Sequence, residues 1–431
     1  KGYKVMDRYP VVARWNPTME FTIASIAAFQ PYVVNGEVEA PAKSLVIPQF
    51  CLRFGDIDNV GITMSHMTGF VMIGQHMFVP PKEWDQEKAF RDILDWLTDG
   101  LGLPKKEITF HEDAWAGGGN FGPCMEYFSR GVELGNQVYM MFEQTPNGPK
   151  ELKLKVLDMG MGHERNAWFS QGKGTIYDAT FPYTIKHLKK VTKVEYDEEL
   201  MQRYIPHAAY LNIDEVEDIA EAWKKVAGEM KMGVDELRKA IEPMTAIYSV
   251  AEHARSLLLA LADGGLPSNV GGGYNLRVIY RRAESYIERF GWEVDMGEVC
   301  SWHAKELREL FPELNENIDD VRKILAVEKR KYLENKKKNK QIITQVLKKG
   351  LPSVEKLIGL YDSNGIPPEQ VVAAAKELGK ELVIPDNFFQ LVAERHEQSE
   401  QKTATKKQTY YAVDDLPNTK IMYYGAHDAV V

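Results

Sequence analysis

The stretch that most constrains this chain is residues 157–165, which reads Leu-Asp-Met-Gly-Met-Gly-His-Glu-Arg. The alternating apolar and polar residues at 152–156 predict a strand before it, and residues 166–169 are compatible with a helix after it. The pattern therefore predicts a carboxylate, Asp158, at the end of a strand. Two glycines then leave the backbone bare, and Arg165 falls near the start of a helix.

Such a connection favours a ligand of mixed charge. Glycines let a ligand approach the backbone because no side chain intervenes. Asp158 could hold an ammonium group, and Arg165 could hold a phosphate. An ordinary strand–turn–helix has the same residues, with a surface ion pair and an aspartate that caps the helix. Taken alone, the stretch favours this ordinary connection, although Asp158 is the best single candidate in the chain.

Composition narrows the class of protein. A chain of 431 residues predicts two or three domains, and its 44% hydrophobic and 10% aromatic content is globular. We find no apolar run long enough to cross a bilayer and no signal-peptide pattern, so we expect no membrane association. The net charge of −9 argues against wholesale coating of nucleic acid, although a local basic patch is compatible with it. The first residues lack an initiator Met, which suggests a fragment.

The cysteines predict neither a zinc site nor a disulfide framework. Cys51, Cys124 and Cys300 stand far apart, and no CxxC or HxxxH pair occurs. We therefore predict no structural metal site, and the cysteine usage suits a reducing cytoplasm.

The first 190 residues or so are rich in strand patterns. Candidate strands are Val11–Trp15, Phe21–Ile26, Leu45–Phe54, Phe70–Phe78, Val138–Phe142 and Leu152–Val156. Within the third, Pro48 argues for an edge strand or an irregular start. An amphipathic helix is expected at 85–97 and a glycine loop at 117–120. Because βαβ alternation is missing, the pattern predicts an antiparallel α+β domain rather than a Rossmann sheet.

From about residue 195 to 397 the pattern becomes helical. Expected helices are Val216–Val226, Met244–Ala262, Tyr274–Ile287, Asp319–Glu334, Ser353–Leu360 and Pro368–Leu378. The basic run at 329–340 is typical of a solvated helix face and is also compatible with weak, salt-sensitive contact to nucleic acid. Residues 397–408 look like a linker, and 410–424 look like strands.

Other candidate residues are individually weak. Arg53 could bind a phosphate, but pairing within its own acidic loop is favoured. His66 could donate to a phosphate, although a structural histidine is commoner. Phe70 could stack on a base, but Phe70, Met72 and Trp115 are typical of core positions.

Taken together in order, six segments resemble the archaeal type of alanyl-tRNA synthetase. Residues 51–68 look like class II motif 2, and 157–165 look like class II motif 3. The other matching segments are 8–26, 112–124, 263–277 and 360–369. The resemblance covers nearly the whole chain.

The resemblance implies an α+β class II synthetase core, an antiparallel sheet with flanking helices, followed by an all-α domain. Residues 1–192 would be the aminoacylation core, 193–397 the helical tRNA-recognition domain, and 398–431 a linker with the first strands of an editing domain. It implies a ligase that converts alanine and ATP to alanyl-adenylate and pyrophosphate and then transfers the alanyl group to alanine tRNA in the cytoplasm. The implied cofactors are ATP and Mg²⁺. The implied partners are alanine and the tRNA acceptor stem, with neither DNA nor membrane.

The resemblance also assigns the ATP-binding residues. Arg53 would bind the alanine carboxylate and the α-phosphate, and Arg165 the γ-phosphate of a bent ATP. Phe70 would stack on adenine, Met72 would contact the nucleotide, and His66 would lie near the phosphates.

For alanine, the resemblance assigns the ammonium to Asp158 and the pocket lining to Gly160. Trp115 and Val138 would bound the methyl group. For tRNA, Asn269 and Asp362 align with the residues that read a G·U wobble pair in the acceptor stem. An amide and a carboxylate suit this task because base edges carry donors and acceptors.

The chain departs from the family pattern at three positions. Val71 replaces a glutamate in motif 2, and Met159 and His163 replace a threonine and a leucine in motif 3. The family's N-terminal helices, with part of motif 1, and its editing site are missing from these residues, so we expect no hydrolysis of mischarged tRNA. Two alternatives stay open: a paralogue that loads another acceptor, and a non-catalytic tRNA-binding protein.

Overall fold

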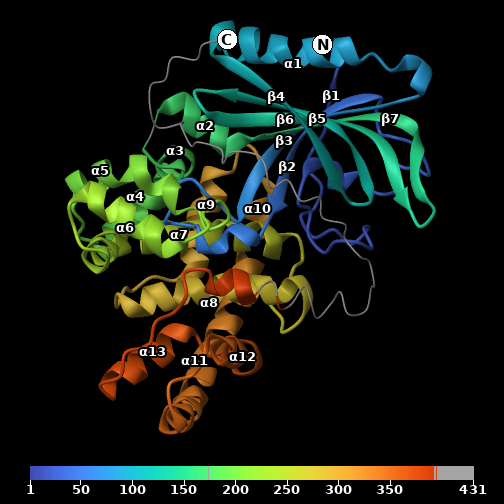
Figure 1. Ribbon diagram of the computed structural model, residues 1–431. Helices are drawn as coiled ribbons and strands as arrows, with labels where there is room; N and C mark the ends of the chain where they lie inside the picture. The colour runs from blue at the N-terminus through green and yellow to red at the C-terminus, as the bar shows by residue number, and fades with distance from the viewer. Residues whose placement is uncertain (173, 393–394, 396–431) are drawn as a thin grey trace. The chain divides into compact units, whose positions relative to one another are not determined.

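A computed structural model of the chain describes residues 1–172, 174–392 and 395, the side chain of Lys337 excepted. These residues form two compact units (Figure 1). Among the described residues, the sheet unit holds 1–52 and 70–172, and the helical unit combines 53–69 with 174–392 and 395. The segment 53–69, called the Arg53–Gly69 segment below, thus interrupts the sheet unit in sequence but packs with the helices. The expected strands at 410–424 lie outside the described residues.

The sheet unit is built on one seven-stranded sheet in the order β1-β2-β3-β7-β6-β5-β4. Its strands are β1 (Lys4–Val5), β2 (Ser44–Leu52), β3 (Gly69–Val79), β4 (Ile108–Gly117), β5 (Asn120–Ser129), β6 (Val132–Thr145) and β7 (Gly148–Gly162). The ladders β3–β7, β7–β6, β6–β5 and β5–β4 are antiparallel, whereas β1 pairs with β2 in parallel. The predicted α+β class is confirmed, and the parallel β1–β2 pair makes the sheet a mixed one.

Each face of the sheet has its own cover. Helix α1 (Gln86–Asp95) lies across one face (Figure 1), and Asp85 caps it by accepting from the Lys88 amide. Ala89 of α1 packs with Tyr139 and Leu157 of the sheet. The opposite face is covered by the N-terminal segment around Ile26–Val34, which packs on β2, β3, β6 and β7. Strand alternation therefore decides which side chains point toward α1 and which toward the N-terminal segment.

Three predictions about strands were wrong. The segments 11–15 and 21–26 form no strands and meet only in an isolated bridge between Val12 and Phe21. Strand β7 continues to Gly162, because β3 pairs with it as far as Met72↔Gly162. Asp158 therefore lies inside a strand rather than at its end.

Pro48 lies within β2, but the β1 partners reach only Leu45 and Val46, so the proline falls where that ladder has stopped.

The short helix α2 (His163–Gln171) completes the sheet unit. The helical unit contains α3 (Ile176–Thr180), α4 (Pro182–Thr192), α5 (Glu198–Ala208), α6 (Ile219–Met230), α7 (Val234–Ala262), α8 (Gly271–Arg289), α9 (Met296–Glu306), α10 (Glu313–Glu316), α11 (Ile318–Lys349), α12 (Val354–Asn364) and α13 (Pro368–Glu377). None of the described helices is long and apolar enough to span a bilayer.

Helix α7 is the core of the helical unit. Every residue from Met244 to Leu261 is buried, so the helix is enclosed on all sides. It ends at Ala262, and Gly264 adopts the left-handed φ of 84° that a helix stop favours. Helix α11 extends beyond the expected end at Glu334, because the basic run continues the helix to Lys349.

Candidate active site

Asp158 faces a buried histidine across the β3–β7 ladder. His76 and Asp158 are register partners, and His76 Nδ1 lies 3.4 Å from Asp158 Oδ1. Burial lowers the pKa of His76 to about 3, so the imidazole is neutral at pH 7. His76 therefore adds no positive charge that would compensate the carboxylate of Asp158. A neutral ring at this position would not repel an ammonium group.

The same sheet face carries the other small-pocket candidates. Val138 pairs with Asp158 across β6 and β7, and Gly160 lies two residues further along β7. Phe70 and Met72 alternate onto this face of β3, in phase with His76. The structure therefore brings these ATP and alanine candidates onto one face, opposite the face that α1 covers.

The Met72 side chain leaves no room for a side chain at position 160. A Cβ built at Gly160 would lie 2.8 Å from Met72 Sδ, closer than real side chains approach. A larger residue at this position would therefore require the Met72 side chain to move.

Trp115 lies beside this face on β4. Its register partner is Gly122, and its ring packs against the cluster around Phe29 and Met140. The ring also lies where a Cβ at Gly117 would clash with it. The expectation that Trp115 and Val138 bound a small methyl pocket is compatible with this arrangement and stays a prediction.

Two of the departures from the family pattern face away from Asp158. Met159 belongs to the buried cluster with Ile93 and Leu97 on the α1 side. Val71 is buried and alternates onto the same side as Ile73. Neither residue lines the face of Asp158, so these substitutions leave the proposed alanine contacts intact.

Strand β7 runs directly into α2 through Gly162, which occupies the N-cap position. Asp158 is therefore not the capping residue of this helix. Glu164 is buried and accepts the Val71 amide at 3.0 and 2.9 Å, which extends the β3 ladder beyond Gly162. Arg165 follows with its side chain 46% exposed, and Nη1 donates to the Glu133 carboxylate at 2.9 Å. An exposed pair of this kind contributes little, so a phosphate can compete for Arg165.

Arg53 and His66 belong to the helical unit. Arg53 is exposed, and its backbone amide donates to the Thr68 carbonyl at 2.8 Å. His66 is half-buried, with Nδ1 2.6 Å from Thr63 Oγ1. A hydroxyl at this distance orients the ring. Both residues are thus carried by one segment whose shape the helices determine.

The two predicted tRNA-reading residues are both held by α8. Arg277 Nη1 donates to Asn269 Oδ1, and the Tyr274 hydroxyl donates to Asp362 Oδ1 at 2.6 Å. Tyr274 and Arg277 stand three residues apart on one face of the helix. Arg277 is itself fixed by the buried Glu328, at 2.6 and 3.0 Å. One helix face therefore supports both readers.

The profile described as tRNA synthetases class II (A) matches residues 1–430. The chain belongs to this family.

Curated relatives of this synthetase chain carry the name alanine–tRNA ligase. The protein of Methanocella arvoryzae is 47% identical over 98% of the chain, and that of Pyrococcus abyssi is 38% identical over 97%. The chain spans 48% of each relative. Among solved structures, pyrrolysyl-tRNA synthetase from Desulfitobacterium hafniense covers 37% of this chain and 53% of its own, with 13% identity and a TM-score of 0.26, too low to bear on the fold.

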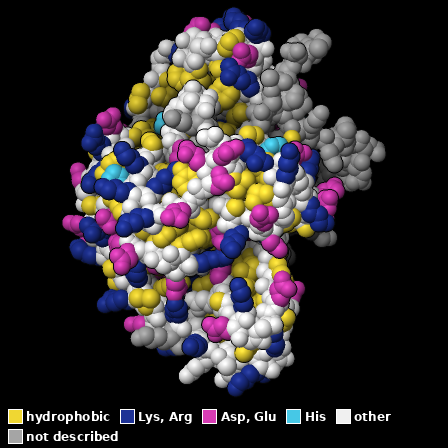
Figure 2. All heavy atoms as spheres, turned by 90° about the vertical axis from the view of Figure 1, so that its left-hand side faces the viewer, with side chains coloured by type: hydrophobic (Ala, Val, Ile, Leu, Met, Phe, Trp, Pro, Cys, Tyr) yellow, Lys and Arg dark blue, Asp and Glu magenta, His cyan; other side chains and the backbone are white. Residues whose placement is uncertain are grey.

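The basic run of the synthetase chain is partly neutralised by α8. Lys329 lies 3.6 Å from Glu284, and Lys336 pairs with Glu288. Figure 2 shows basic and acidic side chains interspersed over the face that it presents. The contact of this run with nucleic acid stays a prediction.

Metal binding gets no direct support from the side chains. In the part of the chain that the structure describes, no group of three or more His, Cys, Asp and Glu could hold a metal ion. A Mg²⁺ ion bound mainly by phosphates and water needs no such cluster, so the residues are compatible with Mg²⁺ arriving with ATP. The three cysteines are free and buried.

Sequence reasoning missed two residues of this synthetase chain. His76 lies in a strand pattern where a core histidine is the ordinary interpretation, and only the register shows that it faces Asp158. Glu252 lies in the apolar stretch of α7 and is completely buried. A lone carboxylate in an apolar helix was the available signal, because an ionised buried group needs partners.

Proposed function

We propose that the chain is the part of an alanine–tRNA ligase that forms alanyl-adenylate and passes the alanyl group to alanine tRNA. Two observations support the proposal: the curated relatives carry that name, and Asp158 shares one sheet face with Val138 and Gly160. The reaction would take place in the cytoplasm.

In the first step an oxygen of the alanine carboxylate attacks the α-phosphorus of ATP, and the bond to pyrophosphate breaks. We assign the ammonium group of alanine to Asp158, beside the neutral His76. Gly160 and Val138 would leave room for a methyl group and little more. A charge-assisted hydrogen bond in a buried site gives both affinity and orientation.

The nucleotide is assigned to the residues that the resemblance to the synthetase family implies. Phe70 and Met72 would contact the adenosine. Arg53 and His66 would neutralise the charge that develops at the α-phosphate, and Arg165 would hold the γ-phosphate after leaving Glu133. Mg²⁺, when bound, would neutralise further phosphate charge.

In the second step a hydroxyl of the terminal adenosine attacks the alanyl carbonyl, and AMP leaves. We assign selection of the tRNA to Asn269 and Asp362, which Arg277 and Tyr274 hold in place. An amide and a carboxylate together offer a donor and acceptors to the edges of a wobble pair.

The test is exchange of labelled pyrophosphate into ATP, measured with a panel of amino acids. We expect exchange with alanine and much weaker exchange with glycine and serine. Transfer is then measured to a tRNA that carries a G·U pair in its acceptor stem and to one that carries G·C. Exchange without transfer to either tRNA would favour a paralogue with another acceptor, and tRNA binding without exchange would favour a non-catalytic protein.

A further inference from the structure

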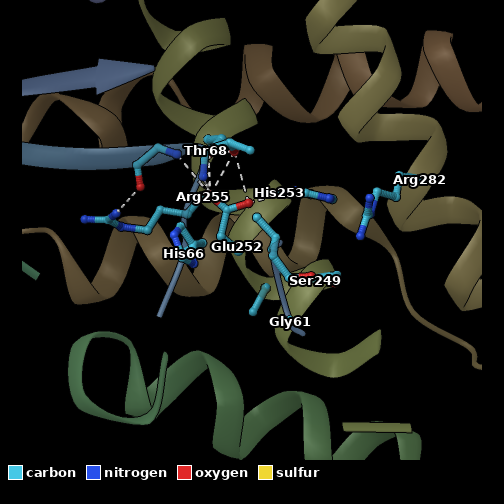
Figure 3. A network of polar contacts seen from close by, with 12 residues as sticks. Gly61, His66, Thr68, Ser249, Glu252, His253, Arg255 and Arg282 are labelled. Carbon is cyan, nitrogen blue, oxygen red and sulfur yellow. Dashed lines mark hydrogen bonds and ion pairs between the residues drawn. The ribbon is translucent and has the colours of Figure 1, made fainter. Parts of the chain in front are cut away.

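A buried carboxylate of α7 holds one end of the Arg53–Gly69 segment. Glu252 is fully buried, and its Oε1 accepts from the Thr68 amide at 2.6 Å, the Thr68 hydroxyl at 2.8 Å and the Gly69 amide at 3.0 Å. Ser256 Oγ, one turn further along α7, donates to the same oxygen at 3.1 Å. Figure 3 shows this convergence on Glu252. The helix thus binds backbone amides of the segment and not only its side chains.

Two neighbours complete the arrangement. His253 Nδ1 lies 2.7 Å from Glu252 Oε2, and Arg255 Nη1 donates to the Gly69 carbonyl at 2.9 Å. Burial alone would raise the pKa of Glu252, but the hydrogen bonds from His253, Gly69 and Thr68 bring it below its usual value. The carboxylate is therefore ionised, and every donor around it is charge-assisted.

The contact extends from Thr68 to Arg53. The Arg53 amide donates to the Thr68 carbonyl at 2.8 Å, so the two ends of the segment are joined. Thr68 is consequently held on one side by Glu252 and on the other by Arg53. The peptide group of Arg53 is two hydrogen bonds away from a side chain of α7.

The middle of the segment is also held, so it has little freedom to adjust if the contact between Glu252 and Thr68 is lost. Gly61 has a φ of 78°, and a Cβ there would lie 2.6 Å from the Thr245 carbonyl oxygen of α7. Asp58 accepts from Arg282 of α8 at 3.2 Å. The segment therefore contacts α7 and α8 in its middle, at Gly61 and Asp58. At its C-terminal end, Glu252 of α7 accepts the backbone amides of Thr68 and Gly69.

We propose that Glu252 is a positioning residue for ATP: through Thr68 and Gly69 it sets the backbone position of Arg53. The helical unit then takes part in adenylate formation, in addition to its expected role in reading tRNA. This inference rests on the proposed function of Arg53. It does not make Glu252 a catalytic residue, because the carboxylate is buried behind the segment.

The variants Glu252→Gln and Thr68→Val remove the charge and the hydroxyl of this contact separately. Thr68→Ser keeps the hydroxyl and is the conservative rescue. Glu284→Gln is the matched control, since Glu284 is also buried in the helical unit but pairs with Tyr280 and Lys329 instead. All four are made in the full chain.

The first measurement is alanine-dependent pyrophosphate exchange over a range of ATP concentrations. We expect Glu252→Gln and Thr68→Val to raise the KM for ATP and to lower kcat by about tenfold to 100-fold, the effect of a misplaced catalytic group. The KM for alanine rises as well, because Arg53 is also assigned to the alanine carboxylate, and Thr68→Ser and Glu284→Gln behave like the unchanged chain. A purely structural role would lower the active fraction and the melting temperature without changing the KM for ATP, and that result overturns the proposal.

The second measurement does not depend on activity. Hydrogen exchange of the peptides covering 53–69 is expected to accelerate by about tenfold in Glu252→Gln, because hydrogen bonds to a charged acceptor are lost. Peptides of α11 serve as the internal control. Unaltered exchange at 53–69 overturns the proposal even if the chain is active. Faster exchange at 53–69 in a chain without ATP turnover supports the contact and refutes the proposed function instead.

Discussion

The imidazole of His76 stands 3.4 Å from the carboxylate of Asp158, and both side chains are buried. The ring is also enclosed by Phe29, with ring centroids 5.4 Å apart, so it cannot turn away from the aspartate without repacking the sheet face. The neutral histidine places a polar ring beside the carboxylate without adding a positive charge. We therefore expect His76 to serve alanine binding and not ATP binding.

Replacing His76 by Phe should weaken the binding of alanine but not that of ATP. The phenyl ring fills the same space but offers no polar atom to Asp158 in place of Nδ1 at 3.4 Å, so we expect the KM for alanine to rise by about tenfold, as for one lost polar contact to a charged group. The KM for ATP should stay unchanged. Equal changes in both constants would show that the substitution disturbs the whole sheet unit.

Acid should destabilise the chain through its buried histidines. Burial lowers the pKa of His76 and of His303 to about 3, so below about 6.5 the unfolded chain binds protons that the folded chain does not. The free energy of unfolding therefore has its full value above the unfolded pKa of about 6.5. It decreases as the pH falls from about 6.5 toward 3, by about 1.4 kcal/mol for each unit of pKa difference.

Urea unfolding between pH 7 and pH 4 measures this loss. The His76→Phe variant should lose part of the pH dependence. A His76→Phe variant with the full pH dependence would mean that His76 is protonated in the folded chain.

Substituting Gly160 should impair both stability and alanine use. The new Cβ would fall 2.8 Å from Met72 Sδ, and overpacking of this kind costs about 1–3 kcal/mol. We expect Gly160→Ala to lower the melting temperature and to raise the KM for alanine. Gly228→Ala is the control, because Gly228 lies in α6 with no atom close to an added Cβ, and it should be neutral or slightly stabilising. Normal alanine kinetics in Gly160→Ala would exclude Gly160 from the pocket.

Removing the Tyr274 hydroxyl should impair transfer of alanine to tRNA without changing adenylate formation. Tyr274→Phe deletes the 2.6 Å hydrogen bond that holds Asp362. We expect slower transfer to the tRNA with the G·U pair and a smaller preference over the G·C tRNA, by about fivefold to tenfold for one hydrogen bond. Pyrophosphate exchange in the same preparation should be normal. An undiminished preference for G·U would remove Asp362 from the reading of the acceptor stem.

The strong periodic patterns were predictable from sequence. The helix at 85–97 and the strands at 45–54 and 70–78 correspond to α1, β2 and β3. Strand propensity gave wrong predictions where the presence of a pairing partner decides whether a strand forms. Residues 11–15 look β-prone but have no strand to pair with beyond Phe21, whereas β7 runs through two glycines because β3 and β6 flank it.

The candidate site was predictable as residue types but not as an arrangement. Asp158 and Arg165 stand out in a short motif, and the resemblance assigned their roles. His76 and Glu252 are distant in sequence from what they orient, and neither lies in a recognisable pattern. Their parts follow only from the β3–β7 register and from the packing of α7 on the Arg53–Gly69 segment.

The central claim is that Asp158 binds the ammonium group of alanine. Its most direct test is alanine-dependent pyrophosphate exchange by Asp158→Asn, with Asp113→Asn as the control, because Asp113 lies in the same cross-strand row but is exposed. We expect Asp158→Asn to lower kcat/KM for alanine by at least about 100-fold while ATP still binds, and Asp113→Asn to match the unchanged chain. Exchange by Asp158→Asn at the rate of the unchanged chain would contradict the account.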